Sequence, residues 1–129
     1  MADTNGASLI ARSLKQQGVD YMFGIVGFPV IPVSIAAQRE GITFIGMRNE
    51  QAASMAAHAA GYLTGRPQAC LVVSGPGVIN ALAGLANAQQ NNWPMVLLGG
   101  ATASTRTAWV PSRKSARSWP RRRSRSTAT

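Results

Sequence analysis

Acidic residues, cysteine and histidine are scarce in this 129-residue sequence, and each scarcity excludes a class of site. Four Asp and Glu residues stand against thirteen Lys and Arg. A single cysteine, Cys70, excludes an internal disulfide and a metal site built from several cysteines, and its apolar surroundings predict a small core residue. The single histidine, His58, has no second histidine or acidic cluster as company, so we expect a packed or surface side chain and no metal site.

Long apolar runs are also missing. No window reaches the roughly 18 continuous apolar residues of a membrane span. The N-terminus lacks the basic segment and apolar stretch of a secretory signal. We therefore expect no membrane partner and a location in the cytoplasm or an organellar matrix. No G-x-S-x-G motif is present either, so nothing favours a Ser-His-Asp nucleophile.

The basic charge belongs to the C-terminal end of the chain. Five basic and four acidic residues precede residue 102, whereas residues 102–129 hold eight basic residues and no acidic one. We therefore divide the chain into a domain of residues 1–101 and a basic low-complexity tail of residues 102–129. The tail has neither helical nor strand periodicity, which predicts a disordered segment.

Two interpretations of the tail are open. As written, a disordered polycation binds nucleic acid or anionic surfaces non-specifically, by releasing counterions. Alternatively, a GC-rich gene read out of frame gives such a mixture of Arg, Ser, Thr, Pro and Ala. With permitted codons, residues 103–114 read from the third nucleotide give Leu-Asn-Gln-Asn-Gly-Met-Gly-Ala-Phe-Gln-Glu. Our hypothesis is a frameshift near Ala101 to Ala103, which the gene sequence would test.

Helix and strand patterns alternate along the first hundred residues. Helices are predicted at 8–15, 32–39, 51–62 and 78–90, and apolar runs of strand length at 21–26, 42–47, 69–73 and 95–100. Strands that are apolar on both faces are typical of buried parallel sheets. The sequence therefore predicts an α/β fold, a doubly wound parallel sheet of about four strands with right-handed crossovers.

The third and fourth predicted helices are crowded with small residues. Small side chains let a helix approach a sheet or another helix closely, so we expect tight core or subunit packing, with a cofactor-facing surface as the alternative. The residues are Ala52, Ala53, Ala56, Ala57, Ala59, Ala60 and Gly61 in one helix, and Ala81, Ala83, Gly84, Ala86 and Ala88 in the other.

Three loops follow the carboxyl ends of predicted strands, at residues 26–29, 48–50 and 74–77. Ligands bind beyond these ends in an open parallel sheet, so the loops are expected to form one crevice if their strands are neighbours. The loop at 74–77 resembles a phosphate-binding glycine loop only weakly, because it lacks the lysine and the glycine spacing of the known motifs. A simple turn explains it equally well.

Glu50, in the second of these loops, allows two interpretations. In the first turn of a helix, its carboxylate complements the positive end of the helix. At the end of a strand, between apolar elements, the same carboxylate is also set up to share a proton with a ring nitrogen.

Five segments occur in an order and spacing that resemble the pyrimidine-binding domain of thiamine-diphosphate enzymes. They are residues 23–29, 48–53, 60–62, 72–77 and 92–94. The amino-acid sequences of these segments look most like the branch of 2-hydroxyacyl-CoA lyase and oxalyl-CoA decarboxylase, and the resemblance covers roughly residues 7–101. It favours the second interpretation of Glu50.

The resemblance implies a role for each residue of the crevice. Glu50 would hydrogen-bond a ring nitrogen of the cofactor's aminopyrimidine and stabilise the imino tautomer that takes the proton from the thiazolium carbon. Phe28 would face the substrate. The remaining cofactor contacts implied are Val26, Gly27 and Pro29 from the first loop, and Gly75, Pro76 and Asn80 from the third.

The same resemblance implies parts that this sequence lacks. The family holds the cofactor diphosphate and Mg²⁺ in a separate C-terminal domain, and two subunits of a homo-oligomer, a dimer or tetramer, surround each cofactor. The out-of-frame Gly-Ala-Phe-Gln-Glu resembles the catalytic-loop segment of the lyase. We therefore expect an N-terminal piece of a thiamine-diphosphate-dependent lyase or decarboxylase acting on 2-hydroxyacyl-CoA or oxalyl-CoA, truncated, frameshifted near residue 101 and inactive alone. The alternatives are an acetolactate-synthase-like piece, a small basic nucleic-acid-binding module, or an assembly remnant.

Overall fold

The computed structural model describes residues 5–101 of the chain, and the predicted tail lies outside them. Helices and strands alternate as predicted, with boundaries that differ by a few residues. The helices are α1 (Gly6–Gln16), α2 (Ile31–Arg39), α3 (Glu50–Thr64) and α4 (Pro76–Asn91). The strands are β1 (Tyr21–Gly24), β2 (Thr43–Gly46), β3 (Gln68–Val72) and β4 (Met95–Gly99).

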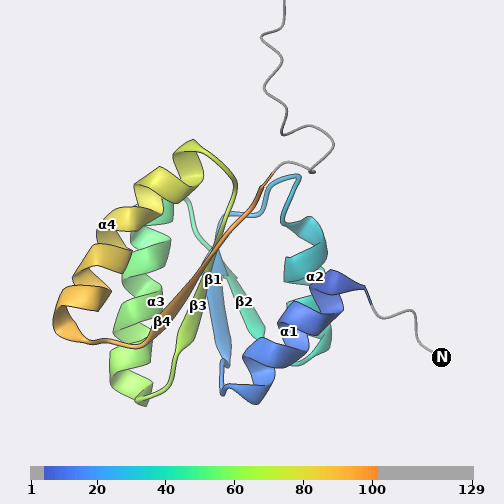
Figure 1. Ribbon diagram of the computed structural model, residues 1–129, viewed down its shortest axis with the longest axis horizontal. Coiled ribbons are helices and arrows are strands. Elements are labelled where there is room, and N and C mark those ends of the chain that lie inside the picture. The colour runs from blue at the N-terminus through green and yellow to red at the C-terminus, as the bar shows by residue number, and fades with distance from the viewer. Residues whose placement is uncertain (1–4, 102–129) are drawn as a thin grey trace, which may run out of the picture.

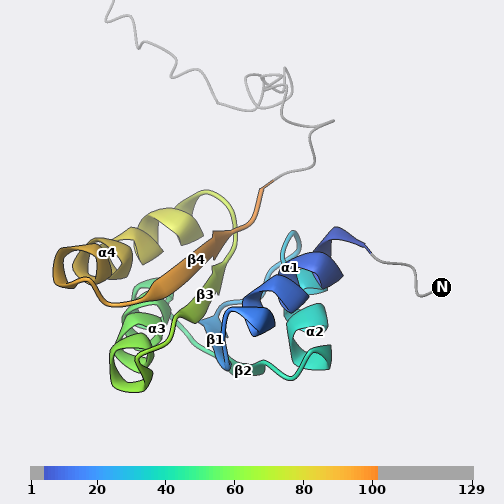
Figure 2. The ribbon, with the colours of Figure 1, turned by 60° about the horizontal axis from the view of Figure 1, so that its bottom comes forward.

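The four strands form one parallel sheet in the order β2-β1-β3-β4. Helices α1 and α2 cover one face of this sheet and α3 and α4 cover the other (Figures 1 and 2). The predicted α/β doubly wound parallel sheet is therefore confirmed. Each helix begins at the end of the sheet where the strands have their carboxyl ends, because the strands are parallel and each is joined to the next through a helix.

Each face of the sheet has its own hydrophobic core. On the face of α1 and α2, Ala11, Val19 and Met22 are fully buried, together with Ala37 from α2. On the face of α3 and α4, the buried residues are Ala53, Ala57, Cys70, Val72 and Ala81. The expectation that Cys70 is a small core residue is confirmed.

Helix α1 differs from its sequence pattern in the side it buries. Leu9 and Ile10 lie at helical spacing with Leu14, but they are 54% and 41% exposed. Ala11 and Leu14, three residues apart on one side of the helix, make the contact with the sheet instead. The apolar character of Leu9 and Ile10 alone did not reveal which side faces inward.

All four strands end one or two residues earlier than the apolar runs that predicted them. β1 stops at Gly24, although the Ile25 N–H still donates to the Leu71 carbonyl, 3.1 Å away. The Val30 N–H then closes a turn on the Gly27 carbonyl at 3.0 Å. α4 starts at Pro76, two residues before the prediction, because a proline in the first helical turn needs no N–H partner.

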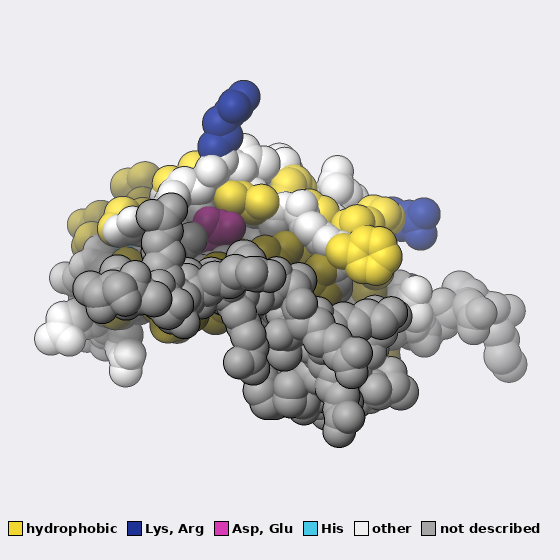
Figure 3. All heavy atoms as spheres, turned by 90° about the horizontal axis from the view of Figure 1, so that it is seen from above, with side chains coloured by type: hydrophobic (Ala, Val, Ile, Leu, Met, Phe, Trp, Pro, Cys, Tyr) yellow, Lys and Arg dark blue, Asp and Glu magenta, His cyan; other side chains and the backbone are white. Residues whose placement is uncertain are grey.

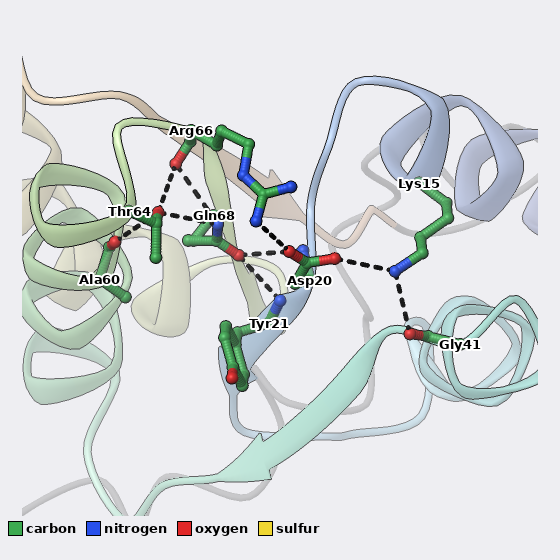
Figure 4. A network of polar contacts seen from close by, with 8 residues as sticks. All are labelled: Lys15, Asp20, Tyr21, Gly41, Ala60, Thr64, Arg66 and Gln68. Atoms are coloured by element: carbon green, nitrogen blue, oxygen red, sulfur yellow. Dashed lines mark hydrogen bonds and ion pairs between the residues drawn. The ribbon is translucent and has the colours of Figure 1, made fainter.

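A polar network joins the turns at the amino ends of β1 and β3 (Figure 4). The buried Gln68 side chain accepts the N–H groups of Asp20 and Tyr21, at 3.1 and 2.8 Å. Asp20 forms ion pairs with Lys15 at 2.9 Å and with Arg66 at 2.7 Å. The network ties the α1–β1 turn to the α3–β3 turn, at the end of the sheet opposite the predicted crevice.

Candidate functional site

The chain leaves the two central strands in opposite directions. From β1 it passes to α2 on one face of the sheet, and from β3, the neighbour of β1, it passes to α4 on the other face. Open parallel sheets bind ligands at such a change of direction, so the predicted crevice is expected between these two loops. Viewed from above, this end of the molecule shows acidic atoms among hydrophobic and uncharged ones, with Lys or Arg side chains extending from the rim (Figure 3).

Glu50 is the first residue of α3 and lies at this end of the sheet. Asn49 caps the helix, because its Oδ1 accepts the Ala52 N–H at 3.0 Å. The Met47 N–H donates to the Gly24 carbonyl at 2.8 Å, which ties the corner before the helix to the end of β1. The Glu50 side chain is therefore held at the crevice by its backbone, and it is half-buried.

The two carboxylate oxygens of Glu50 have different surroundings. The Asn80 side chain, from the second turn of α4, donates to Oε2 at 3.2 Å. Oε1 faces Gly77, where an added Cβ would lie 3.5 Å from it. No hydrogen bond from residues 5–101 reaches Oε1. The carboxylate is thus oriented through one oxygen, and the other is left to accept a proton donor from a ligand.

Two glycine loops meet on the side chain of Val73. A Cβ on Gly77 would lie 2.8 Å from Val73 Cγ2, and one on Gly27 would overlap Cγ1. Both positions therefore exclude larger residues. Gly27 and Gly77 belong to different predicted loops, so Val73 holds the β1–α2 loop against the β3–α4 loop beside Glu50.

The β1–α2 loop also closes on the end of β4. A Cβ on Gly100 would lie 2.7 Å from Val30 Cγ1 and 3.0 Å from Pro29 Cγ. Pro29 thus packs against Gly100, and the Gly100 N–H in turn donates to the Val72 carbonyl at 2.9 Å. The β1–α2 loop is therefore in contact with the end of β4 as well as with Val73.

The structure brings the sequence-predicted residues of the three loops to one end of the sheet, but their side chains differ in how far they are exposed. Val26 is 39% exposed and Phe28 is 93% exposed, so the Phe28 side chain extends into solvent. Gly75 and Pro76 lie on the exposed start of α4. The roles implied for these residues toward a cofactor or substrate stay predictions. Sequence reasoning missed Asn49, Val73 and Gly77; the last had a signal in the Gly-Pro-Gly segment, and the packing role of Val73 had none.

The described residues also bear on the expectations about metal sites and membrane-spanning helices. Among residues 5–101, no three His, Cys, Asp or Glu side chains lie together as a metal site would require. Over the same residues, no helix has both the length and the apolar character needed to cross a membrane. His58 is buried, which confirms that it is a packed residue.

A family model described as "Thiamine pyrophosphate enzyme, N-terminal TPP binding domain" matches residues 4–120. The chain belongs to this family. The match extends beyond residue 101, into the segment that lies outside the described residues. Membership implies thiamine diphosphate as the cofactor.

Members with a named activity support the predicted branch of this thiamine pyrophosphate family. The chain is 59% identical to 2-hydroxyacyl-CoA lyase 1 of Mus musculus over 104 residues, which cover 81% of this chain and 18% of that protein. It is 61% identical to 2-hydroxyacyl-CoA lyase 1 of Homo sapiens over 98 residues, 76% of this chain and 17% of that protein. With oxalyl-CoA decarboxylase of Escherichia coli K12, identity is 46% over 99 residues, 77% and 18% of the two chains. The chain thus spans less than a fifth of these relatives.

The residues of the crevice fit the pyrimidine ring of thiamine diphosphate. Oε1 of Glu50 is an acceptor with no donor among residues 5–101, and the glycine at position 77 keeps the space beside it free of a side chain. A ring N–H is the kind of donor that this arrangement accepts. The fit concerns the pyrimidine end only, because no group of metal-binding side chains that could hold a metal-bound diphosphate occurs among the described residues.

Proposed function

We propose that this chain supplies the pyrimidine-binding side of a thiamine-diphosphate-dependent lyase or decarboxylase that cleaves the carbon-carbon bond next to an acyl-CoA carbonyl. The substrate class is 2-hydroxyacyl-CoA or oxalyl-CoA, in line with the names of its relatives. One observation carries the proposal: no hydrogen-bond donor among residues 5–101 reaches Glu50 Oε1, while Asn80 holds Oε2.

Glu50 has a defined part in this function. Bound thiamine diphosphate supplies a carbon nucleophile that protein side chains lack. Glu50 accepts a ring N–H at Oε1 and shares its proton there, and Asn80 keeps the carboxylate turned toward the ring. A carboxylate shares a proton best where water does not compete for the hydrogen bond. Glu50 is half-buried, so the rest of the enzyme completes the exclusion of water.

The loops around Glu50 form the proposed wall of the pyrimidine site. Val26, Gly27 and Pro29 contribute one side, and Gly75 and Pro76 contribute the other. Phe28 extends away from the wall, which suits a residue that contacts the acyl-CoA substrate. Its 93% exposure supports this assignment, since the side chain has no packing role within the described residues.

Other parts of the active site come from outside this chain in the proposal. Relatives are more than five times as long as the matched segment, so the diphosphate, the Mg²⁺ and the acyl-CoA are assigned to regions beyond it. A second subunit completes each site in a homo-oligomer. We expect the 129-residue chain alone to be inactive, in a cytoplasmic or organellar-matrix setting. Its basic tail would bind nucleic acid only non-specifically.

The pyrimidine site can be tested without the missing parts. In NMR titrations of the chain with 4-amino-2-methylpyrimidine, at an acidic pH where a ring nitrogen of this base carries a proton, we expect the amide signals of Ala52, Ala53 and Gly77 to shift. The shifts should be lost in Glu50→Ala. Glu40→Ala is the matched control, because Glu40 lies at the end of α2 and pairs with Arg12. Shifts that survive in Glu50→Ala would refute the assignment.

The activity of the branch can be tested in a chimera. Residues 6–101 would replace the matched segment of the Escherichia coli oxalyl-CoA decarboxylase. We expect turnover of oxalyl-CoA that depends on thiamine diphosphate. Glu50→Ala should lower this turnover at least about a hundredfold, as the loss of an acid-base group does. Turnover unaffected by Glu50→Ala would contradict the proposal.

A further inference from the structure

Helices α3 and α4 lie side by side and run in the same direction (Figures 1 and 2). Three contacts between their residues follow one another along the pair. The first contact is the Glu50–Asn80 hydrogen bond at the crevice. The second is a close approach of Gly84 to Ser54, and the third is the contact of His58 with Asn87. The contacts recur every three or four residues, so one side of each helix makes all of them.

The third contact leaves a polar atom without a partner. His58 is only 5% exposed, and its Nε2 lies 3.3 Å from the Asn87 side-chain nitrogen. Its Nδ1 is buried, and no hydrogen-bond partner for it occurs among residues 5–101. A buried polar atom without a partner is costly, so the groups around the imidazole determine its state of protonation.

The neighbours of His58 decide which ring nitrogen carries the proton. The Asn91 amide nitrogen donates to the Asn87 backbone carbonyl at 2.8 Å, so this atom of Asn91 is a nitrogen. It also donates to the atom of the Asn87 side chain 2.9 Å away, which must then be the oxygen. The Asn87 NH₂ therefore faces His58, and Nε2 must accept.

The surroundings of His58 contain no charge that would favour the imidazolium. α4, β4 and the turn at residues 92–94 hold no ionisable side chain. The other strands that pack against α3 are β1 and β3, whose ionisable side chains are Tyr21 and Cys70, and neither is a carboxylate. On α3 itself, Tyr62 lies one turn away and Glu50 two turns away. The His58 ring stacks on Trp93 with 5.2 Å between the ring centres, and Trp93 stacks on Tyr62 at 4.9 Å. Burial lowers the pKa of His58.

We propose that His58 is a positioning residue: as a neutral imidazole protonated on Nδ1, it accepts a hydrogen bond from Asn87 and so holds α3 in the register on α4 that brings Glu50 to Asn80. Protonation of Nε2 would set two N–H groups against each other. Asn87 would then have to rotate, and the bond to Asn91 would be lost as well. The inference goes beyond the proposed function, and only its relevance to catalysis rests on that function.

The tautomer can be observed directly, because His58 is the only histidine in the chain. In long-range ¹H–¹⁵N spectra of the untagged 129-residue protein at pH 8, we expect a protonated Nδ1 and a bare Nε2. Protonation on Nε2 would overturn the proposal.

A charge exchange at Asn87 tests the contact. In Asn87→Asp, a carboxylate replaces the donor, so we expect the proton to move to Nε2 and the titration midpoint of His58 to rise. Gln89→Asp is the matched control, because it adds the same charge on the opposite side of α4. An unchanged tautomer and midpoint in Asn87→Asp, or the same change in both variants, would overturn the proposal.

The positioning role has its own readout. The side-chain amide signal of Asn80 should shift with the same midpoint as the His58 ring, and in Asn87→Asp both midpoints should move together. If the Asn80 signal does not follow His58, the positioning role is refuted. None of these measurements uses the cofactor. A correct tautomer with no pyrimidine binding would therefore count against the proposed function alone.

Discussion

Gly84 of α4 lies so close to Ser54 of α3 that a Cβ on the glycine would overlap the serine side chain and backbone. Close packing of a small residue, as the sequence predicted, is therefore confirmed at Gly84. About half of the small residues of α3 and α4 are buried like it, whereas Ala52, Ala59, Ala83 and Ala86 are exposed. Ser54 is fully buried and its Oγ donates to the Gln51 carbonyl at 2.9 Å, so the serine has no free space to move into.

Gly84→Ala should destabilise the protein. The added methyl group costs about 1–3 kcal/mol through overpacking, and the better helix propensity of alanine returns at most about 1 kcal/mol. Urea unfolding monitored by circular dichroism measures the difference. Gly6→Ala is the control, because a Cβ there meets nothing within 4 Å. Equal midpoints for Gly84→Ala and the wild type would show that α3 and α4 are not in close contact.

Gly27 and Val73 should be energetically coupled. Gly27→Ala brings a methyl group onto Val73 Cγ1 and should lower stability by about 1–3 kcal/mol. Val73→Ala removes that obstacle, so the double variant should lose less than the two single variants together. A double-mutant cycle from denaturant unfolding gives the coupling, expected at about 0.5–3 kcal/mol for groups in contact. A coupling near zero would place the two loops apart.

Asp20 should give the protein part of its sensitivity to acid. The hydrogen bond from Lys15, followed by the charge of Arg66, lowers the pKa of its carboxyl group. Its contribution is therefore complete above the unfolded-state pKa of about 3.9 and is lost as the pH falls through the lower folded-state value. Asp20→Asn should lower the free energy of unfolding at pH 7. It should also reduce the fall of that free energy between about pH 5 and pH 2, the range of a paired carboxylate.

Urea midpoints across that range measure the effect for Asp20→Asn. Lys15→Gln removes the stronger of the two effects that lower the pKa of Asp20. Its urea midpoints should depend on pH less than those of the wild type and more than those of Asp20→Asn. A wild-type curve as flat as that of Asp20→Asn would show that Asp20 is not ion-paired.

Cys70 should report unfolding. Burial, with a smaller effect of the Glu50 charge, raises the pKa of its thiol to about 12, and the side chain is fully buried. The thiolate is the reactive form, so the native protein should react with a disulfide reagent at pH 8 only as fast as it opens. Labelling in urea should be complete and rapid. Fast labelling of the native protein would contradict the burial of β3. Because the chain has one cysteine, no other thiol interferes.

The order and type of all eight elements could be predicted because apolar runs of strand length, such as that of β3, alternate with helical patterns along the sequence. The same alternation placed Glu50 at a strand end. Boundaries were less certain where turns decide them: Gly24 ends β1 through a backbone turn that apolar runs do not encode, and Pro76 begins α4 earlier than its hydrophobic pattern does.

Contacts between distant residues were beyond the sequence. Nothing in the pattern indicated that Asn80 donates to Glu50, or that Asn87 and Asn91 fix the ring of His58. Such contacts depend on the register of α3 on α4, and that register is set by contacts between the two helices, the packing of Gly84 on Ser54 among them, rather than by local preference. The predicted boundary at residue 101 stays a prediction, since the segment beyond it lies outside the described residues.

The central strand β3 belongs to both cores at once. Its five residues are all buried, with Ala69 and Leu71 directed to one layer of helices and Cys70 and Val72 to the other. Both layers of helices pack on β3, so the loss of one layer would expose a face of the strand on which the other layer depends. We therefore expect residues 5–101 to unfold in a single cooperative transition. A substitution under α1 or α2 would then reduce occupancy of the Glu50 site from the far face, without touching it.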